Sequence, residues 1–309
     1  MSILIVCNQT DPQPWATALR AQLPKSPIEI YPEVRHPEEI RFILCWKPKH
    51  ALFEQFPNLE VVQSLGAGVD HILDTQSLSE KTMVARIVDP RLSTDMWEFL
   101  LALCMNQIRQ LPLYQRQQDR KIWQGHSYKS ITETTVSILG LGQIGGDVAQ
   151  RFAQLGFKVQ GWSASSKSIL GVRCFDGLGA LPDLLGNTDI LINLLPLTPQ
   201  TRGILGRQNL QYLQSTAYLV NVGRGGHLVE ADLLALLEQG HLAGAALDVL
   251  STEPLPTDHP FWTHPKITLT PHIASLTNVE TAVGQVVENY QRFVAGRALL
   301  NQVSVSKGY

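Results

Sequence analysis

Three ionisable residues, each placed just after a short apolar run, form the most informative pattern in the second half of the chain. They are Arg224 in NVGRGGHLVE, Glu253 in LDVLSTEPLP and His272 in LTPHIAS. A guanidinium binds a carboxylate or polarises a carbonyl through paired donors. An imidazole exchanges protons near neutral pH, and a neighbouring carboxylate orients the ring and favours its protonated form. Together the three residues suit a reaction on a 2-keto or 2-hydroxy acid.

Each of these residues also has an ordinary structural interpretation. Arg224 could be a surface cation, Glu253 a turn residue before Pro254, and His272 a core histidine. Their shared position at strand ends favours chemistry, because ligands of doubly wound folds bind beyond the carboxyl ends of the strands. The sequence therefore places the three on one rim, together with Asp248.

A Gly-rich turn upstream, GLGQIG, predicts a nucleotide site. It follows the apolar run TVSIL and precedes a helical segment and a second apolar run, FKVQGW. In such a unit Gly140 permits the tight turn, Gly142 lets the backbone approach a pyrophosphate, and Gly145 lets helix and strand pack closely. The N–H groups of Gln143 and Ile144, at the helix N-terminus, favour the phosphates.

The residue that would face the adenosine ribose is a serine instead of the usual acid. Ser163 ends the second strand, and Ser165 and Lys167 follow it. An acid at this position would hydrogen-bond the ribose hydroxyls and repel a 2′-phosphate. We therefore predict that NADP(H) is preferred and that NAD(H) can also be used. Ser163→Asp should shift the preference toward NADH.

Apolar runs alternate with amphipathic segments along the whole chain, which indicates an α/β fold built on parallel sheets. Strands are expected at 3–7, 28–31, 42–46 and 61–65, and a second series of six at 135–139, 157–162, 189–195, 217–222, 244–249 and 267–270. Six is the strand count of a complete dinucleotide-binding fold. We predict two doubly wound domains: a Rossmann domain over 94–274, inserted into a flavodoxin-like substrate domain formed by 1–93 and 275–309.

One long helix is expected from Thr94 to about Gln118, with Ser93 or Thr94 as its N-cap. The polar segment after it should form a surface connection. The last part of the chain, from about Ser275, is again helical and should return to the first domain.

Bulk composition excludes several classes of protein. Hydrophobic residues make up 44% and charged residues 17%, with a net charge of −2, which predicts no nucleic-acid or membrane partner. The N-terminal run resembles a buried strand more than a signal peptide. Four separated cysteines favour a reducing compartment, so a cytoplasmic protein is expected. His259 and His264 lack the ligand spacing of a zinc site, and no metal is predicted.

The motifs together resemble the D-2-hydroxyacid dehydrogenase family, and most closely its glyoxylate/hydroxypyruvate reductase A branch. The resemblance extends over nearly the whole chain, through LGAGVDHIL, GLGQIG, INLLPLTPQTRGI, NVGRGGHLVE, LDVLSTEPLP and TPHIAS. One segment departs from the branch. Ala164 and Ser166 stand where the branch commonly has two arginines, and only Lys167 of the basic set remains, so a looser NADPH preference is expected.

The resemblance implies a role for individual residues. His272 would be the acid/base, Glu253 its partner and Arg224 the substrate anchor. The N–H groups of Ala67 and Gly68 would bind the substrate carboxylate, and such a Gly-containing turn can form an anion-binding nest. The remaining implied positions are Trp46 as an aromatic at the substrate, with core packing as the alternative, and Leu195, Pro196, Thr201, Val222 and Asp248 along the cofactor. The family also implies a homodimer formed through the nucleotide domain.

The expected function is reduction of a small 2-keto acid, with glyoxylate and hydroxypyruvate as the substrates that the resemblance implies. Two alternatives stay open. One is a reductase for bulkier acids such as phenylpyruvate, because substrate choice depends on side chains around Trp46, Arg86, Trp97 and Ser275. The other is a nucleotide-sensing co-repressor, a role that the same fold serves and that keeps the same three residues.

Overall fold

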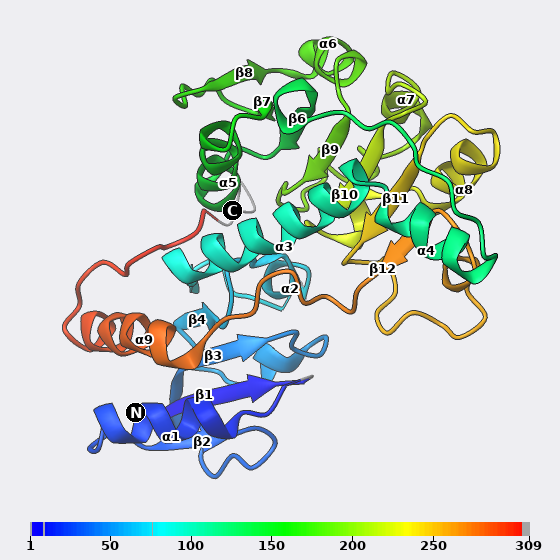
Figure 1. Cartoon of the computed structure of the whole chain (residues 1–309). Coiled ribbons are helices and arrows are strands. Elements are labelled where there is room, and N and C mark those ends of the chain that lie inside the picture. The colour runs from blue at the N-terminus through cyan, green and yellow to red at the C-terminus, as the bar shows by residue number, and fades with distance from the viewer. Residues whose placement is uncertain (1, 9, 76, 305–309) are drawn as a thin grey trace. The chain divides into compact units, whose positions relative to one another are not determined.

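The computed structural model describes residues 2–8, 10–75 and 77–304, which form two compact units. Unit 1 comprises residues 1–91 and 276–309, and unit 2 comprises residues 92–275. Each contains one parallel sheet, shown in Figure 1. Two parallel-sheet α/β domains, one inserted into the other, confirm the predicted fold class.

Unit 1 is built on a five-stranded parallel sheet of order β2-β1-β3-β4-β5, the flavodoxin-like order. Its strands are β1 Ser2–Cys7, β2 Ile28–Ile30, β3 Ile40–Trp46, β4 Val61–Ser64 and β5 Met83–Ala85, and its helices are α1 Gln13–Gln22, α2 Asp70–Leu73 and α9 Val279–Val294. The strands are apolar because both faces are covered. Phe42 of β3 meets Tyr290 of α9 edge to face at 5.6 Å, while Ile43 lies in a cluster with Ile72 of α2.

Unit 2 is built on a seven-stranded parallel sheet of order β12-β11-β10-β9-β6-β7-β8. Its strands are β6 Thr135–Leu139, β7 Lys158–Ser163, β8 Val172–Asp176, β9 Ile190–Asn193, β10 Tyr218–Asn221, β11 Gly244–Leu247 and β12 Ile267–Leu269. The helices are α4 Leu111–Asp119, α5 Gln143–Gln154, α6 Leu181–Gly186, α7 Arg207–Leu210 and α8 Glu230–Glu238, and α3 Pro90–Ile108 begins at the unit boundary.

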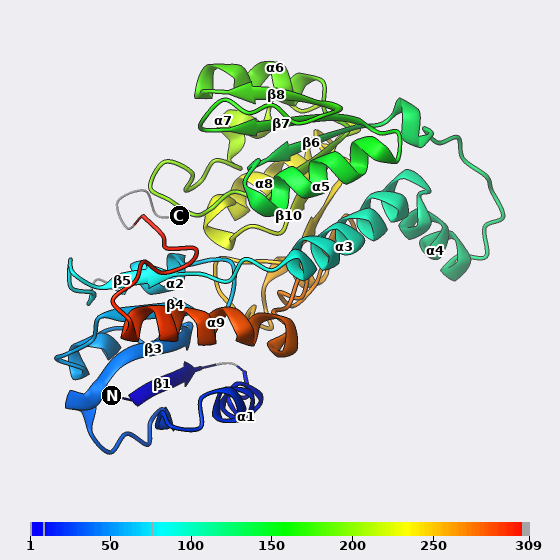
Figure 2. The same ribbon diagram turned by 90° about the vertical axis from the view of Figure 1, so that its left-hand side faces the viewer.

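The helices of unit 2 cover both faces of its sheet (Figures 1 and 2). Buried side chains of α3 and α5 pack with Val136 and Ile138 of β6. Those of α6, α7 and α8 pack with Leu139 and Leu219 on the opposite face. Alternate residues of β6 therefore enter two separate cores, as expected for strands of period two that are buried on both sides.

The structure corrects three expectations about elements. It adds two strands, β5 and β8, that sequence patterns did not predict. The expected helix from Thr94 to Gln118 is two helices, because Gln110 adopts a left-handed conformation (φ 55°) just before Leu111 and Pro112 start α4. Neither Ser93 nor Thr94 is an N-cap: α3 already begins at Pro90, and the Asp89 carboxylate accepts from the Arg91 N–H at 2.9 Å.

Within the described residues, no helix is both long and apolar enough to cross a membrane.

Candidate active site

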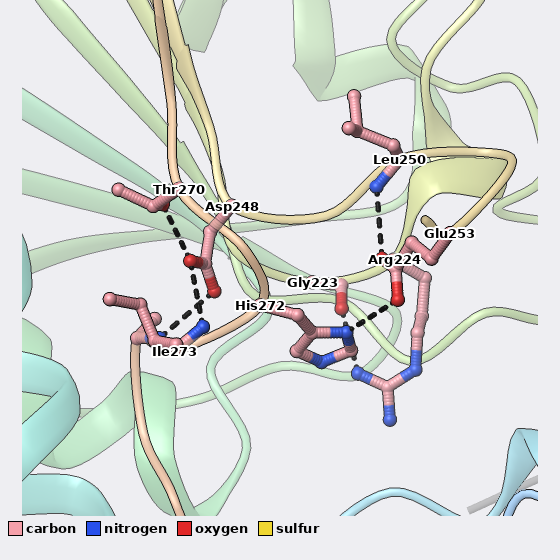
Figure 3. A network of polar contacts seen from close by, with 9 residues as sticks. Gly223, Arg224, Asp248, Leu250, Glu253, Thr270, His272 and Ile273 are labelled. Atoms are coloured by element: carbon pink, nitrogen blue, oxygen red, sulfur yellow. Dashed lines mark hydrogen bonds and ion pairs between the residues drawn. The ribbon is translucent and has the colours of Figure 1, made fainter. Parts of the chain in front are cut away.

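The three ionisable residues follow three neighbouring strands of unit 2. Arg224 comes after β10, Glu253 after β11 and His272 after β12, and these strands are adjacent in the order β12-β11-β10. Because all three strands are parallel, their carboxyl ends meet at one edge of the sheet. Chain segments far apart in the sequence thus converge on one site (Figure 3).

His272 is paired with Glu253. The Nδ1 atom of His272 lies 2.9 Å from Oε2 of Glu253, and the second carboxylate oxygen accepts from the Leu250 N–H at 3.1 Å. Both side chains are partly shielded, with exposed fractions of 27% and 23%. Since the carboxylate can only accept, it places a proton on Nδ1. The other ring nitrogen, Nε2, is left to exchange a proton with a ligand.

The backbone around His272 is held by Asp248. His272 has a positive φ of 56°, which is uncommon for a non-glycine residue. The buried Asp248 carboxylate accepts from the Thr270 hydroxyl at 2.6 Å and from the N–H groups of Ile273 and Ala274 at 2.9 and 3.0 Å. The Asp248 carbonyl also accepts from the His272 N–H at 2.9 Å. These four bonds bracket His272 and fix the direction of its side chain (Figure 3).

Arg224 extends beside this pair, as Figure 3 shows. One guanidinium nitrogen donates to the Gly223 carbonyl at 2.7 Å, which fixes part of the side chain against its own loop. The loop also packs closely on the segment that carries Glu253. A Cβ atom built on Gly225 would lie 1.9 Å from the carbonyl carbon of Leu250, so only glycine fits there. The two loops are therefore held in mutual contact by a residue without a side chain.

A buried polar network lies directly beneath Arg224, and sequence reasoning missed it. It consists of Asn193, the last residue of β9, Asn221, the last residue of β10, and His227, and all three are fully buried. Asn193 and Asn221 are direct partners in the β9–β10 register. The available signal was an asparagine within each of two otherwise apolar runs, INLL and LVNV.

The Gly-rich turn has the geometry expected of a phosphate-binding turn. Gly140 has φ 103°, and Gly142 immediately precedes the twelve-residue helix α5. A Cβ on Gly145 would lie 1.8 Å from the Gly140 carbonyl oxygen, whereas one on Gly142 would meet no atom of the described residues within 4 Å. Gln143 and Ile144 begin α5, so their N–H groups are among the unbonded donors of its first turn. This cradle fits a dinucleotide pyrophosphate.

The segment after β7 shows a feature beyond the three residues singled out in the sequence. Ser163 is buried, and its hydroxyl donates to the Ser165 carbonyl at 2.7 Å, while Ser165 and Lys167 are exposed. Asp176, the last residue of β8, is the direct register partner of Ser163. A carboxylate thus stands one strand away from the place where an acid would select NAD(H).

Two segments along the carboxyl edge hold the other residues expected at the cofactor. Leu195 and Pro196 follow β9, and the Thr201 hydroxyl donates to the Pro196 carbonyl at 2.7 Å, which closes the loop on itself. Val222 follows β10 and lies in the core cluster of α3 and α5. Leu195 and Val222 both follow the carboxyl ends of their strands, and both side chains are buried in core clusters.

In unit 1, the residues expected to bind a carboxylate form a turn after β4. The Ser64 hydroxyl accepts from the Gly66 N–H at 3.1 Å and donates to the Gly68 carbonyl at 2.8 Å. Ala67 and Gly68 are half-buried, and within the described part of the chain no acceptor meets their N–H groups. The turn therefore has two backbone donors to offer an anion.

Trp46 lies against this turn and is not simply a core residue. A Cβ on Gly66 would be 2.7 Å from the Trp46 ring, and the ring contacts that of His71 in a tilted arrangement, with the centroids 4.5 Å apart. Arg86 reaches the Ala67 carbonyl at 3.5 Å, and burial lowers the pKa of its guanidinium. Trp46 remains half-buried, so part of its ring is available to a ligand.

His259 and His264 have local partners. His259 pairs with Glu230 at 3.3 Å, and Nδ1 of His264 accepts from the Lys266 N–H at 3.2 Å. Among the described residues, no group of three or more metal-ligating side chains could hold an ion.

Comparison with known proteins agrees with this geometry. Residues 101–274 match the family described as "D-isomer specific 2-hydroxyacid dehydrogenase, NAD binding domain". The chain is 39% identical to glyoxylate/hydroxypyruvate reductase A of Yersinia enterocolitica and 38% identical to that of Serratia proteamaculans, with 100% of each chain covered.

Solved structures are equally similar. A D-isomer specific 2-hydroxyacid dehydrogenase from Xanthobacter autotrophicus, in complex with NADPH and MES, superposes with a TM-score of 0.93 at 39% identity, covering 100% of both chains. An NADPH-dependent glyoxylate/hydroxypyruvate reductase from Sinorhizobium meliloti, in complex with NADP and sulfate, gives 0.92 at 36% identity, again over 100% of both. These findings confirm the resemblance seen in the sequence. The chain belongs to the D-isomer specific 2-hydroxyacid dehydrogenase family of NAD(P)-dependent oxidoreductases.

Proposed function

We propose that this protein is an NADPH-dependent reductase that converts glyoxylate to glycolate and hydroxypyruvate to D-glycerate. The observation that carries the proposal is the 2.9 Å His272–Glu253 pair on the same sheet edge as Arg224. A proton donor and a carboxylate anchor are the two groups that reduction of a 2-keto acid needs from a protein. The full-length relatives named glyoxylate/hydroxypyruvate reductase A support the choice of substrates.

The residues present fit a dinucleotide. The positive φ of Gly140, the open space over Gly142 and the N-terminus of α5 together suit a pyrophosphate. The residues that would hold the cofactor are Gly140, Gly142, Gln143, Ile144, Gly145, Ser163, Ser165, Lys167, Leu195, Pro196, Thr201, Val222 and Asp248. When bound, the reduced nicotinamide supplies the hydride.

The side chains supply the remaining chemistry. Arg224 binds the carboxylate of the keto acid and polarises its carbonyl oxygen. His272 donates the proton on Nε2 to that oxygen, while Glu253 holds Nδ1 and stabilises the charged ring. The amides of Ala67 and Gly68 bind the carboxylate, and Trp46 contacts the rest of the substrate.

The preference for NADPH rests on Ser163. A serine does not repel a 2′-phosphate as an aspartate would, and the two similar solved structures are complexes with NADPH or NADP. Initial rates on a panel of 2-keto acids with both cofactors test substrate and cofactor together. Higher kcat/KM with NADH would contradict the interpretation of this loop. Higher kcat/KM on phenylpyruvate than on glyoxylate and hydroxypyruvate would favour the bulkier-substrate alternative.

His272→Asn tests the proton donor. Loss of general acid catalysis typically costs about 10²- to 10⁴-fold in rate, and kcat should fall by that order while the NADPH dissociation constant stays unchanged. The matched control is His241→Asn, because Nε2 of His241 lies 3.1 Å from the Gln211 carbonyl oxygen and His241 precedes β11, at the opposite end of the strands. An active His272→Asn enzyme would refute the assignment. The co-repressor alternative finds no support among the named relatives.

The protein is also proposed to be a homodimer. Large apolar side chains are exposed on and after α4, with Leu111, Ile122, Trp123 and Tyr128 exposed by 54%, 45%, 103% and 55%. Leu111 also lines a hollow together with five residues of α3, Phe99, Ala102, Leu103, Met105 and Asn106. Exposed apolar side chains next to such a hollow are typical of protein interfaces.

Sedimentation equilibrium tests the dimer with a charge placed in the hollow. Met105→Glu should give monomers, and Gln208→Glu, which adds the same charge on the exposed side of α7, should not. A wild-type protein that sediments as a monomer would overturn this part of the proposal. Four free thiols support a reducing, cytoplasmic location.

A further inference from the structure

His227 is a fully buried histidine that does not itself reach the sheet edge where Arg224, Glu253 and His272 lie. It closes the network formed with Asn193 and Asn221. Nδ1 of His227 lies 2.9 Å from Nδ2 of Asn193 and 3.1 Å from the Arg224 N–H, and Nε2 lies 3.2 Å from the Pro196 carbonyl oxygen. Every polar atom of the ring therefore has a partner.

Backbone groups determine the orientation of both asparagines. The Gly223 N–H donates to Oδ1 of Asn221 at 3.3 Å, and Nδ2 of Asn221 donates to the Arg224 carbonyl at 3.1 Å. The Leu195 N–H donates to Oδ1 of Asn193 at 3.3 Å. Backbone donors and acceptors cannot exchange roles, so Nδ2 of Asn193 is a donor toward both Oδ1 of Asn221 and Nδ1 of His227.

The same reasoning determines the tautomer of His227. Its Nδ1 faces two donors, Nδ2 of Asn193 and the Arg224 N–H, and one acceptor, the Arg224 carbonyl at 3.1 Å. That carbonyl already accepts from Nδ2 of Asn221, so an unprotonated Nδ1 makes more hydrogen bonds than a protonated one. Its Nε2 lies 3.2 Å from the Pro196 carbonyl oxygen, which can only accept, and so carries the proton. A single assignment, the neutral Nε2–H form, satisfies both nitrogens, and a charged ring would turn a donor toward two donors.

The two ring nitrogens of His227 bind different loops. Nδ1 holds the backbone of Arg224, the proposed substrate anchor, and Nε2–H holds Pro196, in the proposed cofactor segment. We propose that His227 is a positioning residue that sets the substrate anchor and the cofactor segment relative to each other. The proposal rests on the function assigned above to Arg224 and Pro196.

Two substitutions distinguish the hydrogen bond of Nδ1 from that of Nε2. In His227→Asn, the side-chain oxygen can occupy the Nδ1 position and accept from Arg224, but nothing reaches Pro196. In His227→Gln, the longer amide can place a donor at the Nε2 position and reach Pro196, but no acceptor remains for the Arg224 N–H. An uncharged hydrogen bond contributes about 1 kcal/mol, which corresponds to about a fivefold change in a binding constant.

The expected result is a split between two measured constants. His227→Asn should raise the NADPH dissociation constant, measured by nicotinamide fluorescence, about fivefold, with the KM for glyoxylate at saturating NADPH near that of the wild type. His227→Gln should raise the KM for glyoxylate by a similar factor and leave NADPH binding near normal. The control His241→Gln keeps a donor toward a carbonyl outside the network and should change neither constant.

A purely structural role for His227 predicts something different. Both variants would then lower the melting temperature and the active fraction, while KM and the dissociation constant of the folded protein stayed normal or changed in parallel. Either of those outcomes would overturn the proposal. Failure of the proposed function is distinguishable, because the wild type itself would then show no glyoxylate or hydroxypyruvate reduction.

Discussion

Replacing Gly142 and Gly145 by alanine should have opposite consequences, although both glycines lie in the same turn. A Cβ on Gly145 would lie 1.8 Å from the Gly140 carbonyl oxygen, and a Cβ on Gly142 would have no atom of the described residues within 4 Å. Gly145→Ala should therefore damage the fold of unit 2. Gly142→Ala should leave the fold intact and damage cofactor binding.

The cost at Gly145 follows from the distance. Ordinary van der Waals contact begins near 3.4 Å, so the start of α5 and the Gly140 peptide would have to separate by about 1.6 Å. Overpacking typically costs about 1–3 kcal/mol, and here both groups are attached to backbone, so we expect the upper end, about 3 kcal/mol. At about 2–4 °C per kcal/mol, the melting temperature should fall by about 6–12 °C.

The effect at Gly142 falls on binding instead. Its φ of −75° and ψ of −161° are accessible to alanine, and a glycine-to-alanine change at such a position stabilises by about 0.4–1 kcal/mol. The new methyl group would occupy the approach of the pyrophosphate. At an NADPH concentration of about 100 times the wild-type dissociation constant, bound cofactor stabilises the wild type by about 2.7 kcal/mol. A tenfold loss of affinity would reduce this stabilisation to about 1.4 kcal/mol.

Thermal unfolding with and without NADPH measures both effects in one assay. Gly146→Ala is the matched control, because its Cβ would be 3.5 Å from Ile169, an ordinary contact, and neither the melting temperature nor the NADPH shift should fall. If Gly142→Ala binds NADPH as tightly as the wild type, the pyrophosphate does not approach there. If Gly145→Ala melts at the wild-type temperature, the close contact with Gly140 does not constrain the turn.

Three other predictions concern cofactor choice, the His272 loop and the thiols. Ser163→Asp should lower the ratio of kcat/KM for NADPH to kcat/KM for NADH. Asp176→Asn should raise this ratio roughly two- to fivefold, because it removes a negative charge from the strand next to Ser163, about 4.8 Å away. An unchanged ratio in both variants would show that this edge does not select the cofactor. Asp248→Asn leaves at least one of the three groups that donate to this carboxylate without an acceptor, which costs about 1–3 kcal/mol. It should therefore lower kcat for glyoxylate about tenfold or more, and a normal kcat would show that Asp248 does not position His272. Burial raises the pKa of the Cys104 thiol to about 12, so its reactive thiolate is scarce at pH 8 and Ellman's reagent should modify it only after unfolding, whereas rapid modification in the native state would contradict its burial.

Regular periodic segments were predicted well from the sequence, and irregular ones were not. The six strands expected in unit 2 all form, because each is a short apolar run; the four from β6, β9, β10 and β11 are fully or almost fully buried. The seventh, β8, is an edge strand with a mixed pattern of burial, VRCFD, and carries no such signal. The break at Gln110 was missed for a related reason. The apolar pattern continues through it, although Pro112, at the start of the next helix, was an available signal for the break.

The site divides in the same way. Arg224, Glu253 and His272 could be placed on one rim, since each stands just beyond an apolar run. The bonds that orient them could not be foreseen. Asp248 was expected at the cofactor, yet its carboxylate is occupied by Thr270, Ile273 and Ala274, and whether it also meets the cofactor stays a prediction.

The sequence by itself determined the fold class, the nucleotide turn and the residue types of the chemistry, because these depend on local periodicity and on short motifs. Only the tertiary structure decided which nitrogen of His272 faces Glu253, how His227 joins two loops, and that Asp176 stands beside Ser163. Each of these contacts joins residues from different strands or loops. Their register is set by packing of the whole sheet, which no local pattern records.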